Sequence, residues 1–308
     1  MGTYNYIRAG HIIQEILPES NDNMENEEII RAEGLVKRFG KLTAVDGLDI
    51  SLNRGEIYGF LGPNGAGKTT TVRMLTTMDL PNEGTIVIDG YDTRTQYLQA
   101  RGCIGVIQQQ HSLDKDLTVK ENIFHHALMQ NLSIKESKKR MMELAELMEL
   151  TDRMNDKVST LSGGWKKRVA IVCSLIHKPD ILFMDEPTTG LDTQSRNLLW
   201  KMVRNINRTG TTIFLTTHYI FEAESLCDRV GIINKGKLIA QGTPDELMEH
   251  LGRFALVSTD EEGEQTVQYF PDMISAKNAS MDVDHEHTIS IRHINLEDVF
   301  LELTGRRM

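Results

Sequence analysis

The sequence predicts an α/β fold built around a mostly parallel sheet. Short apolar runs of strand type recur along the chain, and stretches with helical periodicity separate them. A glycine-rich loop joins one of these strands directly to a helix. A longer helical region interrupts the alternation of strands and helices. We therefore expect a parallel α/β core with a helical insertion.

In the first part of the chain, strand and helix patterns alternate as far as residue 88. Residues 49–52 alternate apolar and polar side chains, as a half-buried strand does. Residues 56–61 form a short apolar run that predicts a buried strand. Residues 69–80 predict a helix that stops before Pro81, and residues 85–88 predict a further strand between turn residues.

The middle of the chain contains the expected insertion. Residues 118–150 are strongly helical, and another helix is expected at about 165–177. An apolar run at 181–184 predicts a buried strand. A helix around 194–208 then leads to the strand expected at 212–216.

Beyond about residue 250 the apolar runs become shorter. Runs at 253–257, 266–270 and 288–292 resemble strands, and they lead to a helix for which Asn295 is the expected N-cap. Four apolar side chains share one face of that helix: Leu296, Val299, Phe300 and Leu303.

Composition and pattern divide the chain into three parts. Residues 1–28 end in a polar, acidic stretch and predict a flexible extension. Residues 29–247 hold the dense α/β pattern, with a helical subdomain at about 110–178. Residues 248–308 predict a small α+β accessory domain, for which structural or regulatory packing is the expected role.

The bulk composition excludes several classes of protein. A net charge of −10 argues against a general nucleic-acid binder, because phosphate backbones require a basic surface. The three cysteines lack paired spacing and indicate reduced thiols in a cytosolic protein. No stretch approaches the roughly 18–20 apolar residues of a membrane span, and the N-terminus lacks the pattern of a signal peptide. We expect that the chain does not cross a membrane by itself.

The strongest chemical signal is the glycine-rich loop, which satisfies the phosphate-loop pattern between a strand and a helix. Its glycines let the backbone wrap a phosphate, and the helix N-terminus adds partial positive charge. Lys68 is expected to reach the β- and γ-phosphates of ATP, and the Thr69 hydroxyl to bind Mg²⁺. The loop therefore predicts the core of a P-loop NTPase. Its expected ATP-binding residues are Gly62, Pro63, Asn64, Gly65, Ala66, Gly67, Lys68, Thr69 and Thr70.

Two carboxylates follow the strand expected at 181–184. Asp185 is suited to hold Mg²⁺ through water, and Glu186 to orient and polarise an attacking water molecule. An acidic strand end is common by itself, but beside a phosphate loop it indicates nucleotide hydrolysis.

A second anion cradle precedes the helix expected from Trp165. It consists of Leu161, Ser162, Gly163 and Gly164. A serine and two glycines at a helix N-terminus can bind an anion. One triphosphate in a monomer needs only one such cradle, so the second one is surplus within a single chain.

The order of these motifs, together with Gln109, the run 190–192 and His218, resembles the ATP-binding cassette ATPases of the ABC transporter superfamily. The resemblance covers about residues 29–247. It implies an ATPase that uses ATP and Mg²⁺ and pairs with an identical or different ATP-binding subunit. It also implies an integral-membrane permease on a separate chain, which would hold this subunit on the inner, cytoplasmic face of the membrane.

The resemblance implies roles for three residues in nucleotide chemistry. Phe39 matches the aromatic residue that stacks on adenine, although a phenylalanine at this position also suits a strand core. Gln109 matches the glutamine that meets Mg²⁺ and the attacking water and contacts the membrane subunit. The flanking Gln108 and Gln110 leave its register open by one residue. His218 matches the switch histidine near the γ-phosphate, although a histidine after a strand is often structural.

Other matching residues act between two subunits in this family. Ser162 and Gly163 match the signature that closes on the γ-phosphate held by the opposite subunit. Asp192 matches the loop that links the two sites across the dimer. One residue departs from the family pattern, because Trp165 stands where the signature usually continues with glutamine. The departure leaves communication across the dimer, and the rate of turnover, open.

The direction of transport is implied by the resemblance alone. Residues 231–237 and 296–306 are similar to those of daunorubicin-resistance-type exporters of drugs and antibiotics, which implies export of drugs, antibiotics or lipid-like molecules. One alternative is a soluble ABC ATPase that acts on ribosomes or DNA, but such proteins usually have two cassettes or long coiled-coil insertions. Another is a regulatory nucleotide-binding module with little turnover. Glu186 and His218 argue against that module, and Trp165 leaves it open.

Overall fold

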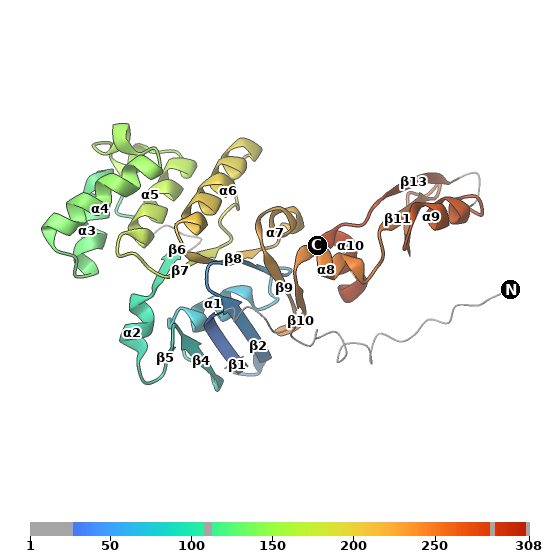
Figure 1. Cartoon of the computed structure of the whole chain (residues 1–308), viewed down its shortest axis with the longest axis horizontal. Helices are drawn as coiled ribbons and strands as arrows, with labels where there is room; N and C mark the ends of the chain where they lie inside the picture. The colour runs from blue at the N-terminus through green and yellow to red at the C-terminus, as the bar shows by residue number, and fades with distance from the viewer. Residues whose placement is uncertain (1–26, 108–112, 284–286, 306–308) are drawn as a thin grey trace.

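The computed structural model describes residues 27–107, 113–283 and 287–305. Its centre is a six-stranded sheet in the order β10-β9-β3-β8-β7-β6 (Figure 1). The strands are β3 (Ile57–Leu61), β6 (Ile104–Ile107), β7 (Ile181–Asp185), β8 (Thr212–Thr217), β9 (Arg229–Asn234) and β10 (Lys237–Gly242). All neighbouring pairs are parallel except β9 and β10. The predicted mostly parallel α/β sheet is confirmed.

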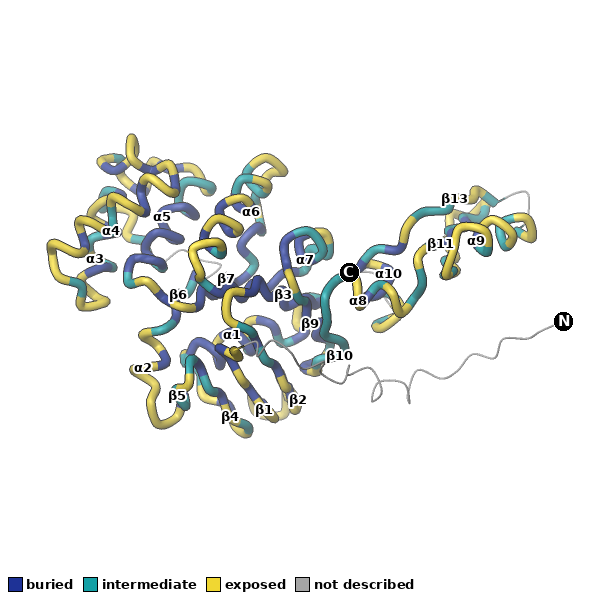
Figure 2. Tube along the Cα trace, viewed as in Figure 1, coloured by how far each residue is buried: buried dark blue, intermediate teal, exposed yellow. Residues whose placement is uncertain are grey.

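Side chains of the central sheet alternate between two hydrophobic cores, as the two-residue repeat of a strand requires. On one face Tyr58, Phe60 and Phe183 surround Phe214, with ring centroids 5.3–5.6 Å from it. On the other face Leu182 and its neighbours pack against the helices. Strands β3, β7 and β8 are therefore buried throughout (Figure 2), and polar residues gather at their ends.

A second, antiparallel sheet covers the first face in the order β2-β1-β4-β5. It consists of β1 (Glu28–Phe39), β2 (Leu42–Asn53), β4 (Glu83–Ile88) and β5 (Tyr91–Asp92). Helix α1 (Lys68–Leu75) shares its core. The sequence predicted only the end of β2 and most of β4. Register shifts in β1 break the regular alternation from which a strand is predicted.

The predicted helical insertion lies between β6 and β7 and forms a layer away from the antiparallel sheet (Figure 1). Its helices are α3 (Val119–Met129), α4 (Ile134–Leu147) and α5 (Gly163–Leu175), with the 3₁₀ turns Thr151–Arg153 and Val158–Thr160. Helices α6 (Thr193–Arg208) and α7 (Ile220–Leu226) border the central sheet, and α2 (Tyr97–Gly102) packs on β5. No helix in the described part of the chain has both the length and the apolar character of a membrane span.

The helix predicted at 69–80 is shorter than expected, because α1 ends at Leu75. Thr77 adopts a left-handed conformation with φ 57°. The amides of Met78 and Asp79 then both donate to the carbonyl of Arg73. Residues 76–80 therefore close the helix instead of extending it.

The last part of the chain forms a three-stranded antiparallel sheet with α9 (Met273–Ser280) on one side. Its strands are β11 (Phe254–Thr259), β12 (Gln265–Phe270) and β13 (Thr288–His293), close to the three predicted runs. Asn295 caps α10 (Leu296–Thr304) by accepting from the amide of Asp298, as predicted. Helix α10 packs on α7 and on α8 (Pro244–Glu249), so the end of the chain returns to the main core (Figure 1).

One buried carboxylate fastens α10 to β13. Asp298 is fully buried and accepts two hydrogen bonds from the Arg292 guanidinium, at 2.6 and 2.7 Å. It also accepts from the backbone amide of Asn295 at 3.0 Å. A bidentate pair of this kind fixes both the distance and the orientation of the two elements.

We predict that Asp298→Ala destabilises the C-terminal part of the fold by about 2–4 kcal/mol, because it removes a buried, charge-assisted pair. Hydrogen exchange should become faster in β13 and α10 and stay unchanged in β3 and β8. The exposed neighbour Glu297 provides the control, and Glu297→Ala should have no such effect. Unchanged exchange in Asp298→Ala would contradict this account.

Candidate functional site

The glycine-rich loop follows the fully buried strand β3 and turns into α1. Gly67 has φ 112°, in the left-handed region that side chains disfavour. A Cβ at Gly67 would lie 2.6 Å from the carbonyl oxygen of Ala44, and one at Gly62 would lie 2.5 Å from that of Ile233. The loop is therefore compressed between β2 and β9, and glycine is required at both ends.

The Lys68 side chain folds back over this loop. Its ammonium group donates to the carbonyl oxygens of Gly62 at 2.6 Å and Pro63 at 3.2 Å, and it lies 3.4 Å from Glu186 Oε1. Burial lowers the pKa of Lys68, and the negative charges of Glu186 and Asp185 oppose that shift. A phosphate bound in the loop would meet a cation that is already oriented.

Asp185 ends β7 beside the first turn of α1. Its Oδ1 accepts a hydrogen bond from the Thr216 hydroxyl at 2.6 Å, and its Oδ2 lies 3.3 Å from the Thr69 hydroxyl oxygen. A carboxylate and a hydroxyl placed together supply the hard oxygen ligands that Mg²⁺ prefers. The donor set therefore fits the cation predicted for Thr69 and Asp185.

Glu186 follows β7 directly, at the edge of the sheet where the parallel strands have their carboxyl ends. Its backbone has φ 47°, an unusual conformation for a side-chain-bearing residue that is typical of strained functional positions. Its Oε2 accepts from the Thr189 hydroxyl at 3.1 Å and lies 3.3 Å from His218 Nδ1. Burial acts to raise the pKa of Glu186, but the charges of Lys68 and His218 outweigh it and hold that pKa below its usual value. The carboxylate therefore stays ionised and able to accept a proton.

The second cradle opens α5. Ser162 is the N-cap residue, yet its side chain makes no capping hydrogen bond to the helix. Ser162 and Gly163 are exposed, whereas Leu161 is buried. No neighbouring atom lies within 4 Å of the position of a Cβ on Gly163. The N-terminus of a 13-residue helix is thus left open to an outside ligand.

Two further predicted residues, Asp192 and Phe39, lie in different places. Asp192 caps α6 by accepting from the Ser195 amide and hydroxyl at 2.8 and 2.7 Å, and these bonds lower its pKa. Phe39 ends β1 with 51% of its surface exposed, which excludes the strand-core alternative, and the Lys37 ammonium group lies 5.4 Å from its ring centroid. Gln109 lies outside the described residues.

Comparison with known proteins places this arrangement in a family. A model of the family described as "ABC transporter" matches residues 45–189. The chain is 42% identical over 305 residues to the Nod factor export ATP-binding protein I of Ralstonia nicotianae, covering 91% of this chain and 95% of that protein. The chain belongs to the ABC transporter family. It is an ATP-binding subunit and an ATPase of that family.

Two further proteins resemble this ABC ATPase. The daunorubicin/doxorubicin resistance ATP-binding protein DrrA of Streptomyces peucetius is 43% identical over 230 residues, or 75% of this chain and 70% of that protein. The predicted resemblance to this subgroup is confirmed. The solved dimer of the ATP-binding cassette MJ0796, in a post-hydrolysis state with ADP and Pi, aligns with a TM-score of 0.63 and 27% identity, over 70% of this chain and 98% of that one. The predicted ABC ATPase core is confirmed.

Trp165, the departure from the family signature, is turned toward the helical subdomain of the ABC ATPase. The guanidinium carbons of Arg168 and Arg153 lie 4.3 and 4.7 Å from its ring centroid. Arg168 in turn donates to the Met148 carbonyl at 3.0 Å and to Glu149 at 2.8 Å. Arg168 lies on the same helix as Trp165 and joins α5 to the residues after α4, while the contact with Arg153 joins Trp165 to the 3₁₀ turn Thr151–Arg153.

Sequence reasoning missed Thr216, which holds Asp185 through its hydroxyl and accepts from the Glu186 amide at 2.9 Å. The role of this threonine can be recognised only when the order of the strands in the sheet is known. Asp185 and Thr216 are direct partners in the parallel pairing of β7 and β8. Only the pairing shows that a threonine near the end of one strand faces the carboxylate that ends another.

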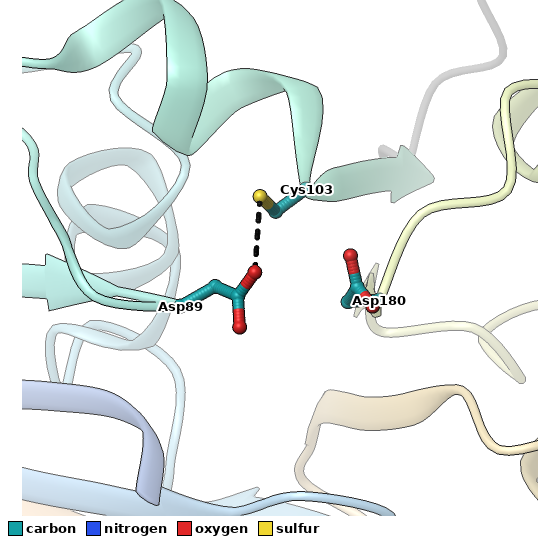
Figure 3. A group of neighbouring side chains, drawn as sticks. All are labelled: Asp89, Cys103 and Asp180. Carbon is teal, nitrogen blue, oxygen red and sulfur yellow. Dashed lines mark hydrogen bonds between the residues drawn. The ribbon is translucent and has the colours of Figure 1, made fainter.

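A second polar group, away from the phosphate loop, has a structural explanation. Asp89, Cys103 and Asp180 place their ligand atoms within 4.8 Å of one another, with a hydrogen bond from the Cys103 thiol to Asp89 (Figure 3). Arg54 pairs with both carboxylates. Burial and Asp89 raise the pKa of Cys103 to about 11, so the thiol keeps its proton. Arg54 offsets part of this negative charge, so hydrogen bonds and ion pairs account for the group without requiring a metal.

We predict that Lys68→Ala weakens ATP binding by about 10- to 150-fold, because a hydrogen bond to a charged group contributes about 1.5–3 kcal/mol. Titration with a fluorescent ATP analogue measures this loss. Arg73 lies on the same helix, forms an exposed ion pair with Asp79 and provides the control. Equal affinities in Lys68→Ala and Arg73→Ala would refute the assignment of the loop.

Proposed function

We propose that this ABC ATPase energises export through a membrane permease by closing, with bound ATP, on a second ATP-binding subunit. The observation that carries the proposal is the open signature cradle. Ser162 and Gly163 face outward at the start of α5 without a ligand group from the described residues of their own chain. In the proposed dimer each cradle completes the ATP site of the opposite subunit. The partner is either a second copy or a related subunit.

The first chemical task is to hold ATP. The loop amides and Lys68 bind its phosphates, and the exposed Phe39 stacks on adenine. Thr69 and Asp185 would hold Mg²⁺, with Gln109 as the further ligand that the family resemblance implies. When bound, the cation would neutralise charge on the phosphates. Asp185 is kept in place for this task by the Thr216 hydroxyl.

The second task is to cleave the terminal phosphate. Glu186 orients a water molecule and accepts its proton as the water oxygen bonds to the γ-phosphorus and the bond to ADP breaks. His218, 3.3 Å from Glu186, fixes the carboxylate and reaches toward the γ-phosphate. The partner's signature adds hydrogen bonds and helix-dipole charge to the same phosphate.

Closure and opening follow from these contacts. ATP favours the closed dimer because it makes contacts with both subunits only in that state. Hydrolysis divides the bridging nucleotide and removes that preference. Asp192 is the N-cap residue of α6, and we assign it the role of passing a movement of one site to the other.

We place the permease at the groove between α2, β6 and α5. The groove measures about 200 Å³, and its lining includes Arg101, Val106 and His177. Ile107 and Leu113, the described residues on either side of the segment that contains Gln109, both line it. Exposed apolar side chains lie on α2 and on the segment after α1: Met78, Leu80, Tyr97 and Leu98. Such a surface suits a short apolar helix of a partner.

Several observations support export from the cytoplasm. The names of two relatives describe Nod factor export and resistance to daunorubicin and doxorubicin. Helices α3 and α4 have 11 and 14 residues, so the described part of the insertion holds no long coiled-coil arm of the kind found in soluble ABC ATPases. We therefore assign the chain to the cytoplasmic face of the membrane, where the permease holds it.

We predict that Glu186→Gln slows hydrolysis by about 10²- to 10⁴-fold, because the amide cannot accept the proton of water. ATP binding should persist, so the variant should accumulate as an ATP-bound dimer in size-exclusion chromatography with ATP and Mg²⁺. Replacing ATP with ADP should return it to monomers. A monomeric variant that hydrolyses ATP at the normal rate would show that Glu186 is not the base.

We also predict that Leu98→Asp weakens binding to the permease at least 10-fold, because it places a charge in an apolar contact. Co-purification with the membrane partner, and stimulation of ATPase activity by it, would both measure this loss. Ile274 on α9 is similarly exposed, and Ile274→Asp provides the control. Equal loss in both variants would argue against the groove as the docking site.

A further inference from the structure

A buried carboxylate on α7 connects the segments that carry the proposed catalytic and coupling residues. Glu222 follows His218 by four residues and is only 1% exposed. Its Oε2 accepts a hydrogen bond from the Thr188 hydroxyl at 3.0 Å, and its Oε1 accepts one from Trp200 Nε1, also at 3.0 Å. Both carboxylate oxygens are thus committed inside the protein.

The two donors, Thr188 and Trp200, lie on the segments that carry Glu186 and Asp192. Thr188 lies in the turn that connects Glu186 to Asp192. Trp200 lies on α6, the helix that Asp192 caps. Glu222 itself lies on the helix that begins just after His218. One side chain therefore joins the two loops that meet at the γ-phosphate position.

The signature helix is part of the same network. Lys167, on α5, is buried and donates to the carbonyl of Pro187, the residue after Glu186. Burial lowers the pKa of Lys167, while the charge of Glu222 acts to raise it. Burial raises the pKa of Glu222, and hydrogen bonds from Thr217, Trp200 and Thr188 oppose that rise. The geometric link between the two segments is the hydrogen bond from Lys167 to Pro187.

We infer that Glu222 is a positioning residue for ATP hydrolysis, which holds the Glu186–Asp192 turn and the His218 loop in a fixed relation to the signature helix. The inference rests on the proposed roles of Glu186 and His218. Without Glu222, the Trp200 indole N–H and the Thr188 hydroxyl would lose their acceptor in a buried site, which favours rearrangement of the turn. The carboxylate does not reach the nucleotide, so ATP affinity should depend on it little.

A matched control distinguishes positioning from general stability. Glu56 is 8% exposed, accepts from Arg229 at 3.1 and 3.2 Å and from the Asn53 amide at 2.7 Å. It lies at the opposite end of β3 from the phosphate loop. Loss of either glutamate removes a buried, hydrogen-bonded carboxylate, but only Glu222 touches the loops of the site.

The test measures steady-state ATP hydrolysis by the full chain with Mg²⁺. Glu222→Ala should lower kcat at least 10-fold and leave KM for ATP within twofold. Glu222→Gln should keep kcat within about threefold of the wild type, because its carbonyl can accept from Trp200 and its amide can donate to the Thr188 hydroxyl. Glu56→Ala should lower thermal stability and leave kcat unchanged.

Milder substitutions at Thr188 provide a second test in case Glu222→Ala does not fold. Thr188→Val should lower kcat, and Thr188→Ser, which keeps the hydroxyl, should restore it. A wild-type kcat in folded Glu222→Ala or in Thr188→Val would overturn the inference, as would a glutamine variant as slow as the alanine variant. Glu186→Gln is measured alongside: normal hydrolysis there refutes the proposed base, whereas an inactive Glu186→Gln with an active Glu222→Ala refutes only the positioning role.

Discussion

The parallel register of β3, β8 and β7 is the constraint on which the candidate site depends. Parallel strands bring their carboxyl ends to one edge of the sheet, so the phosphate loop, Glu186 and His218 meet although they are far apart in the sequence. These strands are buried on both faces, and polar groups gather where they end. Thr216 illustrates the dependence, because it reaches Asp185 only in the observed register.

The proposed ATP site is divided between two places on the chain. Lys68, Asp185 and Glu186 are held by contacts within the chain, whereas Ser162 and Gly163 present an open helix N-terminus. An anion that bridges the two halves gains contacts that neither half supplies alone. In the proposed dimer, ATP acts both as fuel and as the group that holds two subunits together. The buried network around Glu222 contacts the segments that carry both halves, and we infer that it holds them in a fixed relation.

The sequence predicted those parts of the molecule in which a local pattern carries the information. The phosphate loop, the buried strand before Asp185 and the Asn295 cap are of this kind. The antiparallel sheet was largely missed because bulges in β1 obscure its alternation. Strand β6 was missed because it has only four residues. Thr216 and Glu222 depend on strand pairing and helix packing between distant segments, which a single sequence does not display.

A mixing experiment tests the composite site most directly. Lys68→Ala disables the phosphate loop of one subunit, and Ser162→Arg blocks the signature cradle of the other. If each ATP site is built from two subunits, a mixed dimer contains one site with both defects and one intact site. Combining the two inactive proteins should therefore restore a substantial fraction of the wild-type ATPase rate. If the mixture stays as inactive as its components, each site is contained within one chain and the account is wrong.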